Sequence, residues 1–272
     1  MKIGTFLLHI VKLQELCQMN ALEEALKHPA IQGISCVDGD TKIYDRLNLR
    51  EVKHVLDAHG IQTSSVYHVA CCDEIIGTGR ERLKDDLKFQ LDRCASVETK
   101  MMMPVPECSA EIGFPERRKL MMEYFCTAAE LAEPYGIQVV MENYSRAEST
   151  FATVADVGCY LDQIPQLGYV LDTGNFWFTN SDVLEACEKY LSRIVHVHIK
   201  DMKNIKNNPP RVFEGRGFDS VAIGDGDTPI KAIIERLMQI HYSGALSIEI
   251  SSPVQLVEKL ADSIRYLNNW TQ

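Results

Sequence analysis

The stretch RIVHVHIKD, residues 193–201, is predicted to form a β-strand with two different faces. Alternate side chains of a strand point to opposite sides of the sheet. One face is therefore apolar and carries Val195, Val197 and Ile199. The other face carries His196, His198 and Lys200. The kind of sheet that holds this strand decides where the polar face lies, so the rest of the chain has to be considered.

Seven more segments have the composition of strands, being short and rich in valine, isoleucine and methionine. They are residues 2–8, 31–37, 61–69, 99–106, 137–144, 167–174 and 244–250. Helical patterns lie between them, as in residues 81–94, where leucine recurs every fourth position. Eight βα units in 272 residues predict one (β/α)8 TIM-barrel domain spanning residues 1–272. The alternative, a doubly wound sheet, usually has a glycine-rich turn after its first strand, and FLLHIVKL contains no glycine.

In such a barrel, residues at the carboxyl ends of the strands form the functional site. Glu142, Asp172 and Glu249 lie near strand ends beside apolar neighbours that face outward, so their carboxylates are predicted to face inward. Buried carboxylates are costly unless they are paired or bound to a metal ion. With His198 they form a predicted divalent-metal site that suits Mn²⁺ or Zn²⁺, with Mg²⁺ or Co²⁺ as alternatives. His196 lies ~6.6 Å lower on the same face and is predicted not to be a ligand.

The sequence resembles the sugar phosphate isomerase/epimerase superfamily, the xylose isomerase-like TIM barrels, over essentially its whole length. The resemblance is most specific in MENYSRAE (141–148), LDTGN (171–175), HVHIKD (196–201), GDGD (224–227) and IEI (248–250). In that family four metal ligands lie at the ends of strands five to eight, which correspond to Glu142, Asp172, His198 and Glu249. The epimerases use the two metal-bound glutamates as an acid–base pair while the metal stabilises the enediolate. The resemblance therefore assigns the catalytic roles to Glu142 and Glu249.

The resemblance implies a metal-dependent isomerase or epimerase that acts on a small sugar, sugar acid or inositol derivative. Two alternatives stay open, an inosose-type dehydratase and a metal-binding barrel without catalysis. Asn175 stands where the epimerases commonly carry histidine, and no arginine closely follows His198, which argues against a free-ketose 3-epimerase. The endonuclease IV branch needs more histidine ligands than the chain offers. Together with the net charge of −10, this argues against a nucleic-acid partner.

The predicted substrate contacts are His68, Glu107, Glu148, Asn175 and Lys200. Glu148 matches a substrate-binding position of the epimerases, but with Arg146 it also fits a solvated loop pair. His68 ends the third strand, on the same face as Val66, and the alternative for it is a structural histidine. A small-molecule carbohydrate is the expected partner.

Residues 201–227 form the longest connection, which is predicted to be a lid or a disordered loop. The basic side chains of residues 200–216 either bind a phosphate or carboxylate of the substrate or are solvated. They are Lys200, Lys203, Lys206, Arg211 and Arg216.

The nine cysteines include no CxxC pair, which predicts reduced, buried thiols in a cytoplasmic protein. No segment approaches the ~20 apolar residues of a membrane span. The oligomeric state stays open, with a homodimer as one alternative.

Overall fold

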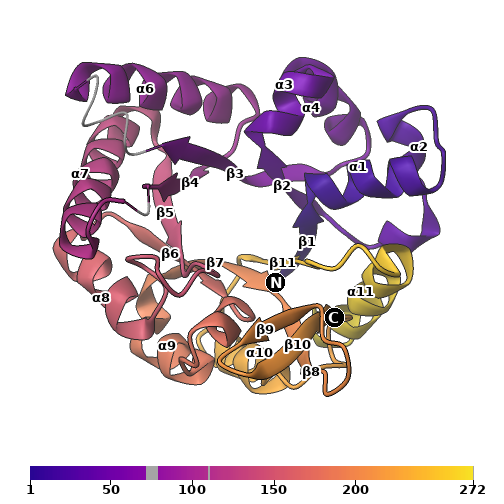
Figure 1. Ribbon diagram of the computed structural model, residues 1–272. Helices are drawn as coiled ribbons and strands as arrows, with labels where there is room; N and C mark the ends of the chain where they lie inside the picture. Colours follow the sequence, from indigo (N-terminus) through magenta and orange to yellow (C-terminus); the bar gives the residue numbers. More distant parts are fainter. Residues whose placement is uncertain (72–78, 110, 272) are drawn as a thin grey trace.

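The protein is a closed barrel of eight parallel strands surrounded by helices in a computed structural model that describes residues 1–71, 79–109 and 111–271 (Figure 1). The neighbouring strands follow the order β1-β11-β7-β6-β5-β4-β3-β2, and β1 closes the barrel by pairing with both β2 and β11. The barrel strands are β1 (Lys2–Phe6), β2 (Cys36–Asp40), β3 (Gln62–Cys71), β4 (Met101–Glu107), β5 (Gln138–Glu142), β6 (Gly168–Asp172), β7 (Ile194–Ile199) and β11 (Ala245–Ile248). The predicted (β/α)8 TIM barrel is confirmed.

The helices cover the outside of the barrel because each has an apolar side that packs against the outward residues of the strands. They are α1 (Leu7–Leu16), α2 (Leu22–Leu26), α3 (Thr41–Leu47), α4 (Leu49–Ala58), α6 (Arg80–Ser96), α7 (Phe114–Ala132), α8 (Val154–Gln163), α9 (Val183–Lys189), α10 (Ile230–Gln239) and α11 (Leu256–Thr271). Leu87 and Leu91 of α6 are fully buried in this outer core. A smaller cluster inside the barrel contains Met103, Val140 and Val170.

Three details of the predicted strands are wrong. The second strand begins at Cys36 instead of residue 31, because Pro29–Ile31 forms a 3₁₀ turn with proline at its start. Leu7 and Leu8 belong to α1 and not to the first strand. A shift in the pairing of β6 with β7 breaks the alternation, so Val195 packs against the inner cluster instead of the outer helices.

The connection after β7 contains a three-stranded antiparallel sheet, so the alternative of a disordered loop is wrong, whereas a role as a lid stays a prediction. Its strands are β8 (Asp201–Asn204), β9 (Arg211–Phe213) and β10 (Arg216–Val221). The Asp201 carboxylate fixes the end of the connection, because it accepts hydrogen bonds from the backbone N–H groups of Gly224, Gly226 and Thr228 at 2.9, 2.9 and 3.2 Å.

The basic side chains of this connection do not converge. Arg211 pairs with Asp219, whereas the Arg216 guanidinium lies over the Trp177 ring. Lys203 and Lys206 are exposed. A single phosphate or carboxylate clamp made of these side chains is therefore not formed.

No helix among the described residues is long and apolar enough to cross a membrane.

The expectation of buried thiols is only partly correct. The thiols of Cys36, Cys94 and Cys187 are buried, but Cys17 is exposed and three others are partly buried. Cys72 lies outside the described residues.

Candidate metal centre

Four polar side chains meet at the carboxyl end of the barrel. Glu142 ends β5, Asp172 ends β6, His198 lies one residue before the end of β7, and Glu249 directly follows β11. Asp172 and His198 are direct partners in the β6–β7 register. One potential ligand atom of each of the four side chains lies within 4.8 Å of those of the other three. The structure thus brings together the four residues that the sequence predicts for one metal site.

The donor set fits a divalent cation. Ligands on opposite sides of an ion, each bound at ~2.1 Å, are ~4.2 Å apart, so small side-chain movements suffice to close the site. The His198 Nδ1 atom contacts Glu142 and lies 3.9 Å from Glu249 Oε2. The Asp172 Oδ2 atom is buried and has no hydrogen bond within the described part of the chain. Three carboxylates and one imidazole nitrogen, facing one another, suit Zn²⁺ or Mn²⁺.

Lys200 provides a fixed positive charge beside these carboxylates. Its ammonium is buried, 2.6 Å from Glu249 Oε1 and 3.1 Å from Asp172 Oδ2, although the latter contact lacks hydrogen-bond geometry. Burial raises the pKa of Asp172 well above its usual value, against the opposing charge of Lys200. Burial would also raise the pKa of Glu249, but Lys200 and His198 lower that pKa to about 2.

Asn175 and Lys200, both predicted to contact the substrate, are hydrogen-bonded to each other beside the donor set. The Lys200 ammonium donates to Asn175 Oδ1 at 2.7 Å, and the Asn175 amide donates to the Asn143 carbonyl at 2.9 Å. Asn143 in turn accepts a hydrogen bond from the backbone N–H of Asp172 at 3.0 Å. This chain of hydrogen bonds holds the strand ends that carry the donor set.

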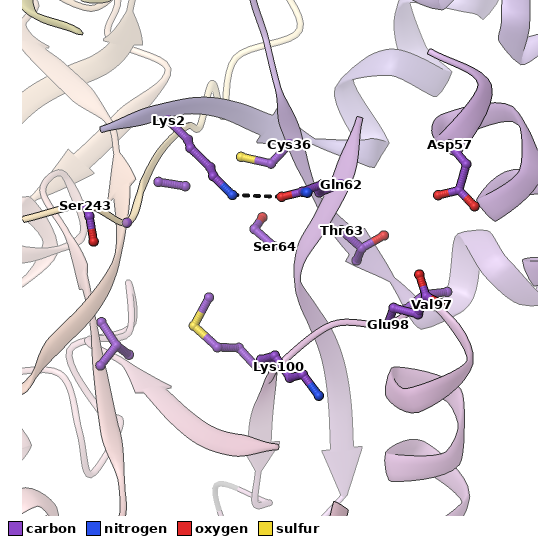
Figure 2. Close-up of a pocket in the computed structure, with 14 residues that line it drawn as sticks. Lys2, Cys36, Asp57, Gln62, Thr63, Ser64, Val97, Glu98, Lys100 and Ser243 are labelled. Carbon is purple, nitrogen blue, oxygen red and sulfur yellow. Dashed lines mark hydrogen bonds between the residues drawn. The ribbon is translucent and has the colours of Figure 1, made fainter. Parts of the chain in front are cut away.

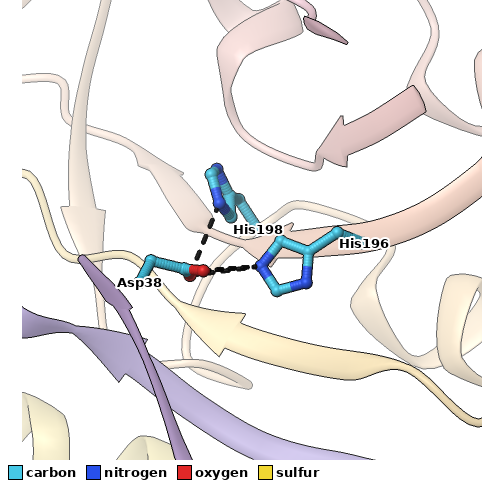
Figure 3. A group of neighbouring side chains, drawn as sticks. All are labelled: Asp38, His196 and His198. Carbon is cyan, nitrogen blue, oxygen red and sulfur yellow. Dashed lines mark hydrogen bonds and ion pairs between the residues drawn. The ribbon is translucent and has the colours of Figure 1, made fainter. Parts of the chain in front are cut away.

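Asp38 of β2 is a residue of the site that the sequence prediction missed (Figure 3). One carboxylate oxygen of Asp38 lies 3.1 Å from His196 Nε2. The other lies 3.6 Å from His198 Nε2, which forms no hydrogen bond within the described part of the chain. The hydroxyl groups of Ser64 and Ser65 donate to the same carboxylate at 2.8 and 2.5 Å. Burial would raise the pKa of Asp38, but the two histidines hold it well below its usual value. Asp38 thus occupies the Nε2 side of His198 and leaves Nδ1 facing Glu142.

A cavity of about 350 Å³ opens beside Glu142 and Glu249 at the barrel mouth. Its walls are mostly aromatic or apolar and include Phe6, Tyr67 and Met103. The sequence alone does not indicate these wall residues, because nothing in their local pattern separates them from core residues.

A second cavity, of about 330 Å³, lies at the opposite end of the barrel (Figure 2). It is lined by residues from the starts of strands, including Lys2, Cys36 and Gln62. Lys2 donates a hydrogen bond to Gln62 at 2.7 Å. Because the donor set lies at the carboxyl ends of the strands, this cavity is separate from the candidate site.

The remaining predicted substrate contacts lie away from the donor set. His68 faces outward, with Nε2 3.2 Å from Asp86 of α6, because an extra residue at Ser64 in β3 shifts the alternation. This position agrees with the structural alternative for His68. Glu107 accepts a hydrogen bond at 2.7 Å from Tyr144, a residue that lines the cavity. Glu148 is exposed.

Comparisons with known proteins agree with this architecture. The family model of xylose isomerase-like TIM barrels matches residues 25–270. Inosose dehydratase of Histophilus somni is 24% identical over 93% of this chain and 90% of that protein. Among solved structures, IOLI protein with a binding zinc atom has a TM-score of 0.74 at 18% identity, covering 99% of this chain and 98% of that one. For 3-keto-D-glucoside 4-epimerase YcjR from E. coli the TM-score is 0.72 at 18% identity, covering 99% of both chains. The chain belongs to the xylose isomerase-like TIM barrel family.

Proposed function

We propose that the protein is a metal-dependent isomerase or epimerase that moves a proton next to a carbonyl group of a small sugar, sugar acid or inositol derivative. One observation carries the proposal: Glu142 and Glu249 both belong to the donor set and both line the same cavity. A purely metal-binding barrel has no need of two basic carboxylates beside a cavity of substrate size. The names of the inosose dehydratase relative and of the 3-keto-D-glucoside 4-epimerase support this class of substrate.

The proposed cofactor is one divalent ion per chain, held by Glu142, Asp172, His198 and Glu249. Zn²⁺ or Mn²⁺ fits these donors best, with Mg²⁺ or Co²⁺ as alternatives. The bound ion would supply Lewis acidity that polarises the carbonyl and hydroxyl oxygens of the substrate. The zinc atom in the IOLI structure supports the choice of a divalent metal.

The two glutamates are placed to act as base and acid on different sides of the substrate. They come from β5 and from the end of β11, which β6 and β7 separate in the barrel. One carboxylate removes the proton, and the other returns a proton to the opposite face or to the neighbouring carbon. Lys200 binds Glu249 Oε1 at 2.6 Å, so the ammonium holds this side chain in place and favours its ionised form.

A dehydratase is the second candidate, and it is favoured by the match to inosose dehydratase over nearly the whole of both chains. The first step would be the same proton removal. The glutamate that took up this proton would then pass it to a departing β-hydroxyl group, so that one water is released and both glutamates are ionised again.

The two candidates differ in a measurable way. We expect the metal-loaded protein, incubated in D₂O with ketoses, keto acids and inososes, to place deuterium on the carbon beside the carbonyl. NMR and mass measurement then separate an isomerase or epimerase, whose product keeps its water, from a dehydratase. Absence of exchange with every substrate would support the barrel without catalysis.

Glu142→Gln and Glu249→Gln test the roles of the two carboxylates. Each variant keeps the shape of the side chain and removes its basicity, so we expect turnover to fall ~10²–10⁴-fold. Metal content is measured alongside turnover, and Glu258→Gln on the exposed side of α11 is the matched control. Near-native turnover of both variants with metal bound would show that the glutamates are ligands only.

A further inference from the structure

The helix that directly follows β1 directs a lysine into the cavity at the barrel mouth. Leu8 and Lys12 are one helical turn apart on α1, and both line this cavity. The opposite side of α1 is anchored in the core by Leu7, Ile10 and Val11, all buried. The position of Lys12 beside the cavity is therefore set by the packing of the helix.

Lys12 has no hydrogen bond or ion pair with any residue in the ranges 1–71, 79–109 and 111–271. Lys200, by contrast, contacts Glu249, Asp172 and Asn175. Lys12 and Glu249 also both influence the buried imidazole of His9. Burial lowers the pKa of His9 to about 4, the charge of Glu249 opposes this change, and the charge of Lys12 adds to it. The charge of Lys12 thus acts at the same end of the barrel as the donor set.

No negative charge of the described residues around the cavity is left to balance the positive charge of Lys12. The three carboxylates of the donor set are balanced by Lys200 and a divalent ion, under the function proposed above. Apart from the two glutamates of the donor set, none of the described residues that line the cavity with Lys12 is anionic. An ammonium group in this setting favours an anionic ligand.

We propose that Lys12 binds a carboxylate of the substrate, so that the enzyme acts on a small keto acid in preference to a neutral keto sugar. This inference rests on the proposed function and narrows its substrate class. One ammonium matches the single charge of a carboxylate. The apolar wall offers few further donors for the three oxygens of a phosphate group.

Three probes that differ only at one end of the carbon chain test this proposal. D-fructuronate carries a carboxylate where D-fructose carries a hydroxymethyl group and D-fructose 6-phosphate carries a phosphate. Calorimetry with the zinc-loaded protein measures the affinity for each. We expect fructuronate to bind about 10-fold or more tightly than fructose.

Lys12→Met keeps the length of the side chain and removes its charge. We expect this variant to lose the preference for fructuronate, Lys12→Arg to retain it, and the affinity for fructose and the zinc content to stay unchanged. Lys42→Met, at an exposed position of α3, is the matched control. Equal or absent binding of fructuronate and fructose by the native protein would overturn the proposal, as would tighter binding of the phosphate or an unchanged preference in Lys12→Met.

Deuterium exchange separates this inference from the function on which it rests. Exchange without a preference for the acid contradicts only the role of Lys12. A preference for the acid that Lys12→Met abolishes, without exchange on any substrate, contradicts only the enzymatic function.

Discussion

Asp38 occupies the side of His198 that faces away from the other proposed ligands. Its carboxylate gathers contacts from two histidines and two serines inside the barrel. A histidine that binds a metal through one nitrogen usually has its other nitrogen held by a carboxylate or carbonyl group. We therefore assign Asp38 the task of orienting His198.

Asp38→Asn should weaken zinc binding ~10–100-fold while the protein stays folded. The amide keeps the shape of the side chain but removes the negative charge that favours a proton on Nε2 of His198. Zinc affinity is measured by competition with a chelator, and Asp162→Asn on the exposed side of α8 serves as control. Equal affinities in the native protein and Asp38→Asn would show that Asp38 only fills space.

The sequence predicted the grouping of the four proposed ligands because each ends a strand and alternates with apolar residues. It did not predict Asp38, because the strand expected over residues 31–37 stops before this residue, whereas the observed strand runs from Cys36 to Asp40. His68 was placed on the wrong face because the bulge at Ser64 depends on pairing between strands. Local pattern alone does not determine such pairing.

At the level of elements, Arg193 connects the start of β7 to the end of α8. Its guanidinium donates to the carbonyl oxygens of Leu161, Ile164 and Pro165 at 2.8, 3.0 and 3.1 Å. The last carbonyl groups of a helix have no partner within the helix, and this single side chain satisfies that of Leu161 together with two carbonyl groups that directly follow α8. Lysine has no planar fork and cannot reproduce the arrangement.

Arg193→Lys should lower the free energy of unfolding by about 2 kcal/mol, because charged hydrogen bonds to the chain are lost. Urea unfolding measures the change. The same substitution at Arg265, on the exposed side of α11, is the control. A loss no larger than that of the control would mean that water replaces the guanidinium without cost.

The existence of the eight strands followed from the sequence, since each is a short apolar segment followed by a helical pattern. The antiparallel sheet of residues 201–221 did not follow, because its strands have only three to six residues and are stabilised by pairing with one another. Such short strands carry too little periodicity to be separated from a loop.

For the whole molecule, closure of the barrel depends on contacts between its first and last segments. Thr5 donates to the Ile248 carbonyl at 3.1 Å, and His9 Nε2 lies 3.2 Å from the Ile250 carbonyl oxygen. Thr5 and His9 also bond to each other at 2.8 Å. The buried imidazole therefore forms part of the closing seam between β1 and β11.

This seam makes stability depend on pH. Burial lowers the pKa of His9 from 6.5 to about 4, so below pH 6.5 the unfolded chain takes up a proton that the folded chain does not. The stabilisation is present above pH 6.5 and is lost as the pH falls toward 4. Urea unfolding of the metal-free protein measures this effect. The free energy of unfolding of the native protein should exceed that of His9→Asn by about 2 kcal/mol less at pH 4.5 than at pH 7.5.

The control for this measurement is His54→Asn, at an exposed position of α4. We expect the difference in free energy of unfolding between this variant and the native protein to be nearly constant over the same pH range. A constant difference for His9→Asn as well would mean that His9 is hydrated and takes up protons in the folded chain.

The four proposed ligands and most of the other residues that line the cavity come from different halves of the chain. The four proposed ligands lie between residues 142 and 249, whereas Phe6, Tyr67 and Met103 of the wall come from the first 107 residues. Substitutions in the first half can therefore change most of the cavity wall without touching the four proposed ligands. Lys12 lies outside the segment matched by the family model, residues 25–270. Sequence divergence in this family can therefore change the substrate before it changes the reaction.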